Sequence, residues 1–382
     1  MIYLDSASTA KYRNIIDDMV VSTMMVAMKD YWQNPSSLYS AYVKEEINEC
    51  RADIAEFVGA KPNEIYFTSG ASESNSWAIR GWVDYVSANT LQPINVITTP
   101  IEHKSTLEAA RSISLGARLY HCDVDEFGFV DYKSLEYLLI MCEEEPVLVS
   151  VHMANNEIGT IQDIKKISNL VHKYNGILHV DATQAFGHIN INVEDLGIDM
   201  MSCSGHKISP VLKGIGFLYK KNCINIRPLI YGTQENGLRG GTENTFGIIG
   251  LAKAIKYCNF TTEMMDLEDK RDYFINMLHS KFGCKLNGHN EYRLPNNINV
   301  TFPQNITGEA LLYILDLNNI KISVGSACNS HSIEPSYVLK EIGLNDEEAM
   351  RTVRFTLPED ITYEDIDCVI DEIGRSIKLI ET

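Results

Sequence analysis

The sequence predicts an α/β protein with a large domain built on a mostly parallel sheet and a smaller α+β domain. Two observations carry this prediction. Short apolar segments alternate with helical ones through the first two thirds of the chain, and the order of elements changes in the last third. Strands of a parallel sheet covered on both faces are continuously apolar and are joined by helical crossovers.

Five apolar segments have the length and composition of buried strands: 64–68, 95–99, 147–151, 177–181 and 200–204. Helical segments separate them, so we expect them to lie in one sheet. In such sheets, ligands bind at the carboxyl ends of the strands. The residues that directly follow these strands are therefore the candidates for a functional site.

The last third of the chain predicts the smaller domain. Its expected elements are a helix over 262–282, a strand over 298–302, a helix over 308–317, strands over 320–323 and 351–357, and a final amphipathic helix from about Tyr363. We expect the large domain to span 16–255. The small domain is expected to combine 1–15 with 256–382.

Composition narrows the classes of function. The 382 residues are 45% hydrophobic and 22% charged, as in ordinary globular proteins. The formal net charge of −18 disfavours direct binding to nucleic acid and suits a basic protein partner. No apolar segment is long enough to span a bilayer, and the N-terminus lacks the pattern of a signal peptide, so a cytoplasmic location is expected. The nine cysteines show no zinc or disulfide spacing.

The first strand end is the segment 68–75, Thr-Ser-Gly-Ala-Ser-Glu-Ser-Asn. A glycine turn that leads small hydroxyl residues into a helix presents free N–H groups, which suit a phosphate. An ordinary helix N-cap explains the same residues. The dinucleotide and Walker A glycine patterns are absent, so NAD and ATP gain no direct support.

Three further strand ends carry polar side chains. Asp181 would hold a pyridinium nitrogen protonated, or cap a helix, or pair with a cation. Lys207 directly follows a buried strand, where a lowered pKa would suit a Schiff-base lysine, although a surface-turn lysine is the alternative. His103 follows the strand at 95–99 and would lie over a cofactor ring and move protons, or serve only a structural role.

Together these segments resemble the cysteine desulfurases of the class V aminotransferase family, the NifS/IscS-like branch with a Gly-Ser-Ala-Cys loop. The matching pieces run from Tyr3 to about Ile373 in family order. They are 3–5, 34–36, 68–71, 102–104, 155–159, 179–184, 204–207, 237–242, 325–328, 334–337 and 354–355. The resemblance implies the fold of type I enzymes that depend on pyridoxal 5'-phosphate.

The resemblance also implies a role for each matching residue. Lys207 would bind the cofactor aldehyde, Asp181 the pyridine nitrogen, and His103 the ring face. The ring oxygen would contact Asn156 and Gln184, and the phosphate would contact Ala71, Ser72, Ser204 and His206. Thr242 would reach the phosphate of a neighbouring subunit, which implies a homodimer. Arg354 and Asn34 would bind the substrate carboxylate, because the guanidinium fork engages both oxygens.

Cys328 is the residue that points to sulfur chemistry. It lies in the small, polar segment 325–331, which suits a mobile loop better than a core, although a buried inert cysteine is the alternative. The resemblance implies that L-cysteine is converted to L-alanine while its sulfur moves to Cys328 and then to an acceptor protein. Such an acceptor would serve iron–sulfur cluster assembly, tRNA thiolation or the synthesis of another thio-cofactor.

Other functions remain as alternatives. Selenocysteine lyase is the nearest one, followed by other class V enzymes such as kynureninases and epimerases, which do not need the Gly-Ser-Ala-Cys loop. A non-catalytic sulfur-relay subunit is expected to lose Lys207, Asp181 or Cys328, and all three are present. The chain departs from the usual family pattern at Ser6, Thr233 and Asn236 and in the turn at 209–212. It also ends at Thr382 without the tail that housekeeping members use to dock a scaffold.

Overall fold

The structure is a computed structural model that describes residues 1–113, 117–258, 262–303, 306–324 and 334–380. Its centre is a seven-stranded sheet with the strand order β2-β8-β7-β6-β5-β3-β4. The strands are β2 (Ile65–Thr68), β3 (Ile94–Thr98), β4 (Ala117–His121), β5 (Val147–His152), β6 (Ile177–Asp181), β7 (Met200–Ser204) and β8 (Gly216–Lys220).

The sheet is mostly parallel, as the sequence predicted. Only β8 runs against its neighbours β2 and β7. The five predicted strands match β2, β3, β5, β6 and β7 to within a residue at each end. The sequence reading missed β4 and β8. β4 lies at the edge of the sheet and is only partly buried, so its sequence does not show a continuous apolar segment.

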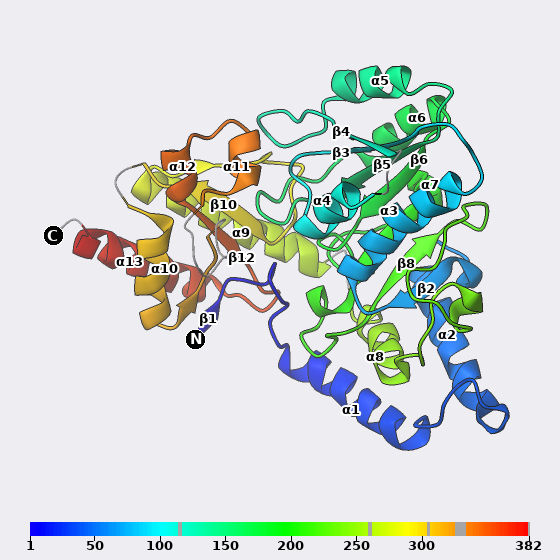
Figure 1. Ribbon diagram of the computed structural model, residues 1–382. Helices are drawn as coiled ribbons and strands as arrows, with labels where there is room; N and C mark the ends of the chain where they lie inside the picture. The colour runs from blue at the N-terminus through cyan, green and yellow to red at the C-terminus, as the bar shows by residue number, and fades with distance from the viewer. Residues whose placement is uncertain (114–116, 259–261, 304–305, 325–333, 381–382) are drawn as a thin grey trace.

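Helices cover both faces of this sheet (Figure 1). Buried side chains of α3 and α4 form an apolar cluster with one face, and those of α1, α2, α5, α6 and α8 form a larger cluster with the other. The helices are α1 (Asn14–Asp30), α2 (Ala41–Phe57), α3 (Ala71–Ser87), α4 (Lys104–Arg111), α5 (Tyr132–Met141), α6 (Ile164–Lys173), α7 (Val193–Leu196) and α8 (Thr245–Ile255). Short 3-10 turns are η1 (Leu38–Ser40), η2 (Pro62–Glu64), η3 (Gly205–Lys207) and η4 (Glu235–Gly237).

A second, separate core lies in the last third of the chain. A three-stranded antiparallel sheet with the order β12-β10-β9 packs against three long helices. The elements are α9 (Thr262–Phe282), β9 (Lys285–Leu286), β10 (Asn297–Thr301), α10 (Gly308–Leu317), β11 (Ile320–Lys321), α11 (Tyr337–Glu341), α12 (Asp346–Met350), β12 (Thr352–Thr356) and α13 (Tyr363–Ile380).

The N-terminal segment joins this second core. β1 (Ile2–Tyr3) pairs in parallel with β11, and Leu4 is fully buried in the same apolar cluster. This arrangement agrees with placing the first residues together with the last third. The expected boundaries of the two domains, 16–255 and 1–15 with 256–382, stay predictions.

The large sheet points its carboxyl ends toward the second core (Figure 1). Parallel strands bring the residues that follow them to one edge, so β5, β6 and β7 deliver their last residues to the junction between the two cores. Among the described residues, no helix combines the length and apolarity that crossing a bilayer requires.

Candidate active site

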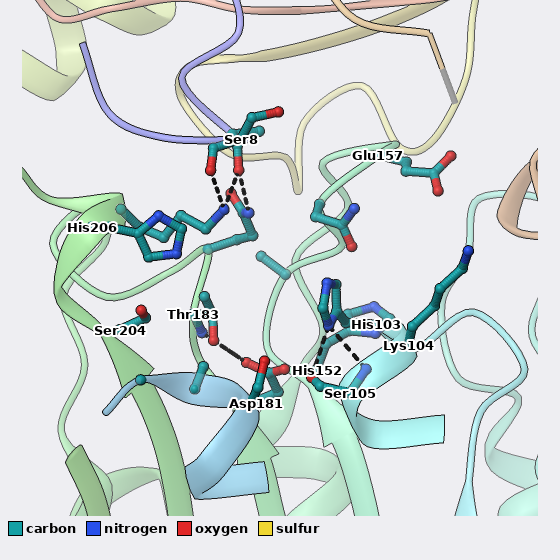
Figure 2. A pocket seen from close by; sticks show the side chains of 18 of the residues that line it. Ser8, His103, Lys104, Ser105, His152, Glu157, Asp181, Thr183, Ser204 and His206 are labelled. Carbon is teal, nitrogen blue, oxygen red and sulfur yellow. Dashed lines mark hydrogen bonds between the residues drawn. The ribbon is translucent and has the colours of Figure 1, made fainter. Parts of the chain in front are cut away.

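A cavity of about 880 Å³ lies at this junction (Figure 2). Ten of the residues singled out from the sequence line it: Ala71, Ser72, His103, Asn156, Asp181, Gln184, Ser204, His206, Lys207 and Arg354. They come from the ends of β2, β3, β5, β6 and β7 and from β12 of the second core. The structure therefore brings together groups that lie as much as 283 residues apart, from Ala71 to Arg354.

Lys207 ends the 3-10 turn that follows β7. Its ammonium group donates hydrogen bonds to the carbonyl oxygens of Ala7 at 2.5 Å and Ser8 at 2.9 Å. Burial, and then repulsion from Arg354, lowers its pKa from the ordinary 10.5 to about 8. A sizeable neutral fraction near pH 8 makes this amine competent to attack a carbonyl carbon.

Asp181 is the last residue of β6 and is 5% exposed. Asn75 of α3 donates to its Oδ2 at 2.7 Å, and the backbone N–H of Thr183 donates to its Oδ1 at 3.0 Å. These bonds hold the carboxylate in one orientation at the cavity. A fixed, buried carboxylate suits a cationic ring nitrogen.

The segment at 69–72 forms a cradle at the N-terminus of α3. Gly70 occupies the N-cap position with φ +147°, in a conformation that L side chains rarely adopt. Because glycine has no side chain to cap the helix, the first N–H groups of α3 remain for a ligand in the cavity. Ser204 and His206 line the same cavity. An anionic group such as a phosphate fits here.

These groups fit pyridoxal 5'-phosphate. The amine of Lys207, the carboxylate of Asp181 and the cradle at 69–72 open on one cavity, and they match the aldehyde, the ring nitrogen and the phosphate of that molecule. His103, an exposed residue at the N-cap of α4, completes the lining between them.

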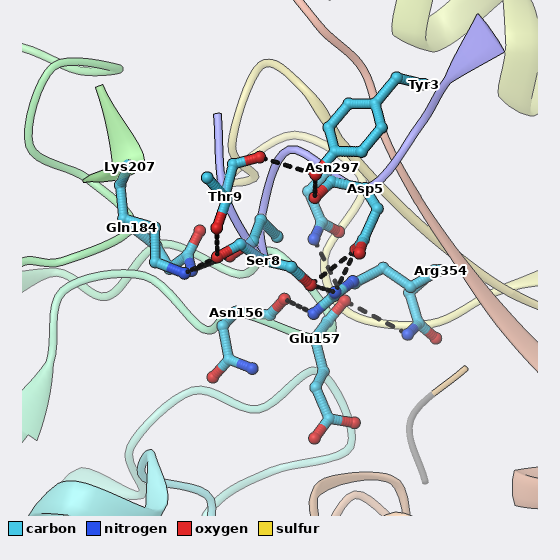
Figure 3. A network of polar contacts seen from close by, with 12 residues as sticks. Tyr3, Asp5, Ser8, Thr9, Asn156, Glu157, Gln184, Lys207, Asn297 and Arg354 are labelled. Carbon is cyan, nitrogen blue, oxygen red and sulfur yellow. Dashed lines mark hydrogen bonds and ion pairs between the residues drawn. The ribbon is translucent and has the colours of Figure 1, made fainter. Parts of the chain in front are cut away.

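Arg354 projects from β12 into the same cavity (Figure 3). Its Nη2 donates to Asp5 Oδ1 at 2.8 Å and to Ser8 Oγ at 3.2 Å, and its Nη1 donates to the carbonyl oxygen of Asn156 at 2.9 Å. Its Nε is buried and has no hydrogen-bond acceptor among the described residues. The guanidinium is thus oriented, with capacity left for a further acceptor.

Three predicted residues do not line this cavity. Asn34 is exposed and accepts a hydrogen bond from the backbone of Ser36, 2.9 Å away. Thr242 lines a separate hollow of about 180 Å³ beside Glu235 and Arg239. Cys328 lies outside the described residues.

Comparison with known proteins assigns the family. The model for "Aminotransferase class-V" matches residues 2–369. The chain belongs to the class V aminotransferase family. Relatives named "Cysteine desulfurase IscS" include one from Dictyoglomus turgidum, 40% identical across 100% of this chain and 95% of the relative. Another, from Clostridium botulinum strain Hall, is 41% identical across 99% of this chain and 94% of the relative.

Solved structures agree with this assignment. A protein described as "NIFS-LIKE PROTEIN" superposes on this class V member with a TM-score of 0.89, at 32% identity and 99% coverage of both chains. A second, "SspA in complex with cysteine", gives a TM-score of 0.80 at 34% identity, covering 94% of this chain and 99% of that one.

Sequence reasoning missed several residues at the cavity of this class V family member. His152 is the last residue of β5 and Asn75 orients Asp181 from α3. Glu157 is buried and accepts a hydrogen bond from the hydroxyl group of Ser336 at 2.5 Å; burial raises the pKa of this carboxyl. The sequence could have indicated His152, because it directly follows the apolar segment at 147–151 and ligands bind at the carboxyl ends of such strands. The contacts of Asn75 and Glu157 are between segments far apart in sequence.

Proposed function

We propose that this protein is a cysteine desulfurase that depends on pyridoxal 5'-phosphate. One observation carries the proposal: Lys207, Asp181 and Arg354 open on a single cavity in a chain that matches curated cysteine desulfurases over its full length. An amine for the cofactor, a carboxylate for its ring and a guanidinium for an amino acid carboxylate are the groups that this reaction needs.

The cofactor would be held by groups that the cavity already presents. Lys207 would bind it covalently, Asp181 would pair with its ring nitrogen, and His103 would contact the ring face. The ring oxygen would contact Asn156 and Gln184, and the phosphate would contact Ala71, Ser72, Ser204 and His206. When bound, pyridoxal phosphate supplies an electron sink that stabilises negative charge at the substrate α-carbon.

The substrate carboxylate would bind Arg354. Asp5 and Ser8 already hold this guanidinium at the cavity, so little side-chain entropy is lost on binding. Asn34 is the second residue proposed for this carboxylate, from its place in the family pattern. Lys207 would move the α-proton, because its lowered pKa of about 8 lets the amine both accept and return a proton near neutral pH. His103 is the second candidate for this proton.

Sulfur would then move to Cys328. Cys328 belongs to the segment 325–333, and the described residues on either side of that segment, Val324 and Glu334, both line the cavity. The Cys328 thiolate would attack the substrate sulfur, and the bond from that sulfur to the β-carbon would break with its electron pair left on the carbon. The β-carbon would take up a proton, which balances the one that Cys328 loses on ionising, and the product would be L-alanine, while the substrate's thiol hydrogen stays on the outer sulfur. An acceptor thiol then takes the outer sulfur by exchange.

A second copy of the chain is the proposed partner. Large apolar side chains are exposed along α1 and the segment after it: Ile15, Met25, Val26, Met28, Trp32, Leu38 and Tyr39. So many exposed apolar side chains in one stretch of the chain, called here the apolar patch, favour an interaction surface. Thr242, in its separate hollow, would face the phosphate site of the partner subunit.

The decisive experiment is incubation of the protein with pyridoxal phosphate and L-cysteine. We expect L-alanine in solution and one added sulfur on the peptide that contains Cys328, measured by mass spectrometry. The Cys328→Ala variant should keep its yellow colour and form no persulfide, and Lys207→Ala should lose the band that borohydride fixes to the protein. Full sulfide release by Cys328→Ala would contradict the assignment. Parallel assays with selenocysteine separate this function from selenocysteine lyase.

A further inference from the structure

A second imidazole, that of His152, lies at the cavity and has no part in the proposed function. It is the last residue of β5 and the register partner of Asp181 on β6. It lines the same cavity as Lys207 and is only 5% exposed, and Figure 2 labels it between His103 and Asp181. The sheet itself therefore fixes the place of this side chain.

His152 is paired with a buried carboxylate. Its Nδ1 lies 2.8 Å from Oε1 of Glu102, a residue with no exposed surface. The hydroxyl group of Thr99 donates to the same oxygen at 2.6 Å. A buried carboxylate requires a counter-charge, and His152 is the one basic side chain that the described part of the chain places in ion-pair contact with Glu102.

The other ring nitrogen is left for a ligand. Pairing of Nδ1 with a carboxylate keeps a proton on that nitrogen, so Nε2 is the atom that can exchange a proton. Both ring nitrogens are buried: Nδ1 lies within ion-pair distance of Glu102 without the angles of a good hydrogen bond, and Nε2 has no partner at all within the described residues. A buried polar atom without a hydrogen bond lowers the stability of the folded protein. That cost is removed if a bound molecule supplies the missing hydrogen-bond partner.

Two carboxylates, Glu102 and Asp181, act on His152, and the titratable side chains of His103 and Lys207 line the same cavity. Glu102 comes from the segment after β3, Asp181 from β6, His103 from the start of α4, and Lys207 from the turn after β7. Burial by itself lowers the pKa of His152, but Glu102 and, more weakly, Asp181 outweigh it, so the pKa lies above its ordinary value of 6.5. The imidazole therefore holds a proton more firmly than a solvent-exposed histidine does.

We propose that His152 is a positioning residue of the loaded active site. With Glu102 it forms a buried charge pair, and its free Nε2 contacts the bound cofactor or substrate. The charges of the pair set the protonation equilibrium of the bound cofactor. This inference rests on the proposed cofactor site at Lys207. It assigns a role to Glu102 as well, since the carboxylate acts through the imidazole.

The test is a pH titration of the visible absorbance band of the protein loaded with pyridoxal phosphate. His152→Gln leaves the charge of Glu102 uncompensated, so a proton is held more tightly and the midpoint should rise. Glu102→Gln removes the carboxylate that keeps the buried imidazole protonated, so His152 becomes neutral and the net charge of the pair does not change. We expect His152→Gln to raise the midpoint by at least about half a pH unit, a threefold change in proton affinity, Glu102→Gln to shift it less, and the double variant to behave as Glu102→Gln does.

Two controls make the result specific. His172 forms a similar pair, with Nε2 2.7 Å from Asp199 Oδ2, but it does not line the cavity, so His172→Gln should leave the midpoint unchanged. His152→Asn keeps a hydrogen-bonding amide near the position of Nδ1 and lacks Nε2. It should shift the midpoint as the glutamine variant does, and it serves if that variant fails to fold.

The outcomes are distinguishable. If the wild-type protein shows no band that borohydride fixes to Lys207, the proposed function and this inference both fail. If the wild type shows the band but His152→Gln leaves its midpoint unchanged or lowers it, or if Glu102→Gln shifts it as much as His152→Gln does, only the role of His152 is overturned. A purely structural role for the pair predicts no shift of the midpoint in either variant.

Discussion

At the scale of single residues, the chemistry depends on the environment of Lys207. An ordinary lysine is almost entirely protonated at neutral pH, whereas burial and the nearby Arg354 lower the pKa of this one to about 8. At pH 7 roughly a tenth of the molecules then carry a neutral amine. The end of β7 places the amine of Lys207 in the cavity, and the positive charge of Arg354, from the small domain, helps to lower its pKa.

This environment predicts the pH dependence of cofactor capture. Only the neutral amine attacks the aldehyde, so the rate at which the cofactor-free protein takes up pyridoxal phosphate should rise with pH and level off above about pH 8. The measurement is the growth of the visible absorbance band after mixing, over a series of pH values.

Substitution of Arg354 tests the direction in which this side chain shifts the pKa of Lys207. Arg354→Gln removes a positive neighbour, so the pKa of Lys207 rises and the plateau moves to higher pH. The same variant should reduce kcat/KM for L-cysteine by about tenfold or more, because a charge-assisted hydrogen bond of roughly 1.5–3 kcal/mol is lost. Arg351, which donates to the Glu347 carbonyl oxygen outside the cavity, provides the control Arg351→Gln. An unchanged plateau in Arg354→Gln would refute this account.

At the scale of elements, strand β8 supports the phosphate cradle. A Cβ atom on Gly216, the first residue of β8, would lie 2.4 Å from the carbonyl oxygen of Cys203 and 2.7 Å from Cα of Gly70. Both contacts are with backbone, which cannot move aside cheaply. The closeness of β8 to the turn before α3 therefore depends on glycine at this position.

Gly216→Ala should displace the cradle and weaken cofactor binding. We expect the dissociation constant of pyridoxal phosphate to rise by about tenfold or more and the protein to lose roughly 1–3 kcal/mol of stability from overpacking. Equilibrium dialysis and thermal unfolding measure the two effects. Gly374 in α13 is the matched control, since its added Cβ meets nothing closer than 3.7 Å and alanine favours a helix. Equal behaviour of the two variants would show that Gly216 is not a special position.

Sequence patterns located most of these elements but not all their partners. The segments at 177–181, 200–204, 262–282 and 308–317 have the predicted bounds, because each is a continuous apolar or amphipathic segment. β8 was missed although it is a short, fully buried segment, and its antiparallel pairing with β2 joins residues 148 positions apart, Thr68 and Gly216. No local pattern shows a pairing over that distance.

At the scale of the whole molecule, Arg293 joins the two cores. It is 1% exposed, and it donates to the carbonyl oxygen of Ile158, which borders the active-site loop, at 2.7 Å. It also donates to the carbonyl oxygens of Asn287 and His289 in the second core. Asn297 and Asn299 of β10 donate to the carbonyl oxygen of Glu157 at 3.2 Å each. The loop that carries Asn156 is thereby fixed to the second core.

Arg293→Met should be strongly destabilising. It leaves several buried carbonyl oxygens without donors, so we expect a loss of about 3 kcal/mol or more in the free energy of unfolding. Denaturant titration of the loaded protein measures it. Arg375→Met, which removes an exposed ion pair with Glu372, should cost less than about 0.5 kcal/mol. A loss no larger than that of the control would mean that the guanidinium does not hold the cores together.

The apolar patch on α1 and after it predicts the assembly. Trp32 is 69% exposed and Leu38 is fully exposed, so a glutamate at either position should break a dimer that uses this face. Sedimentation should show a dimer for the wild type and monomers for Trp32→Glu and Leu38→Glu. Leu91, equally exposed outside the patch, supplies the control Leu91→Glu, which should remain dimeric. Dimers in all variants would place the interface elsewhere.

The sequence by itself determined the α/β fold and nominated ten of the residues that line the cavity, because apolar segments and the polar residues after them are local features. Only the tertiary structure decided which groups meet. The lowered pKa of Lys207 depends on Arg354, which lies 147 positions further along the chain, and the pairing of His152 with Glu102 depends on neighbouring strands. These interactions depend on how far apart the side chains are in space, whereas the sequence gives only their separation along the chain.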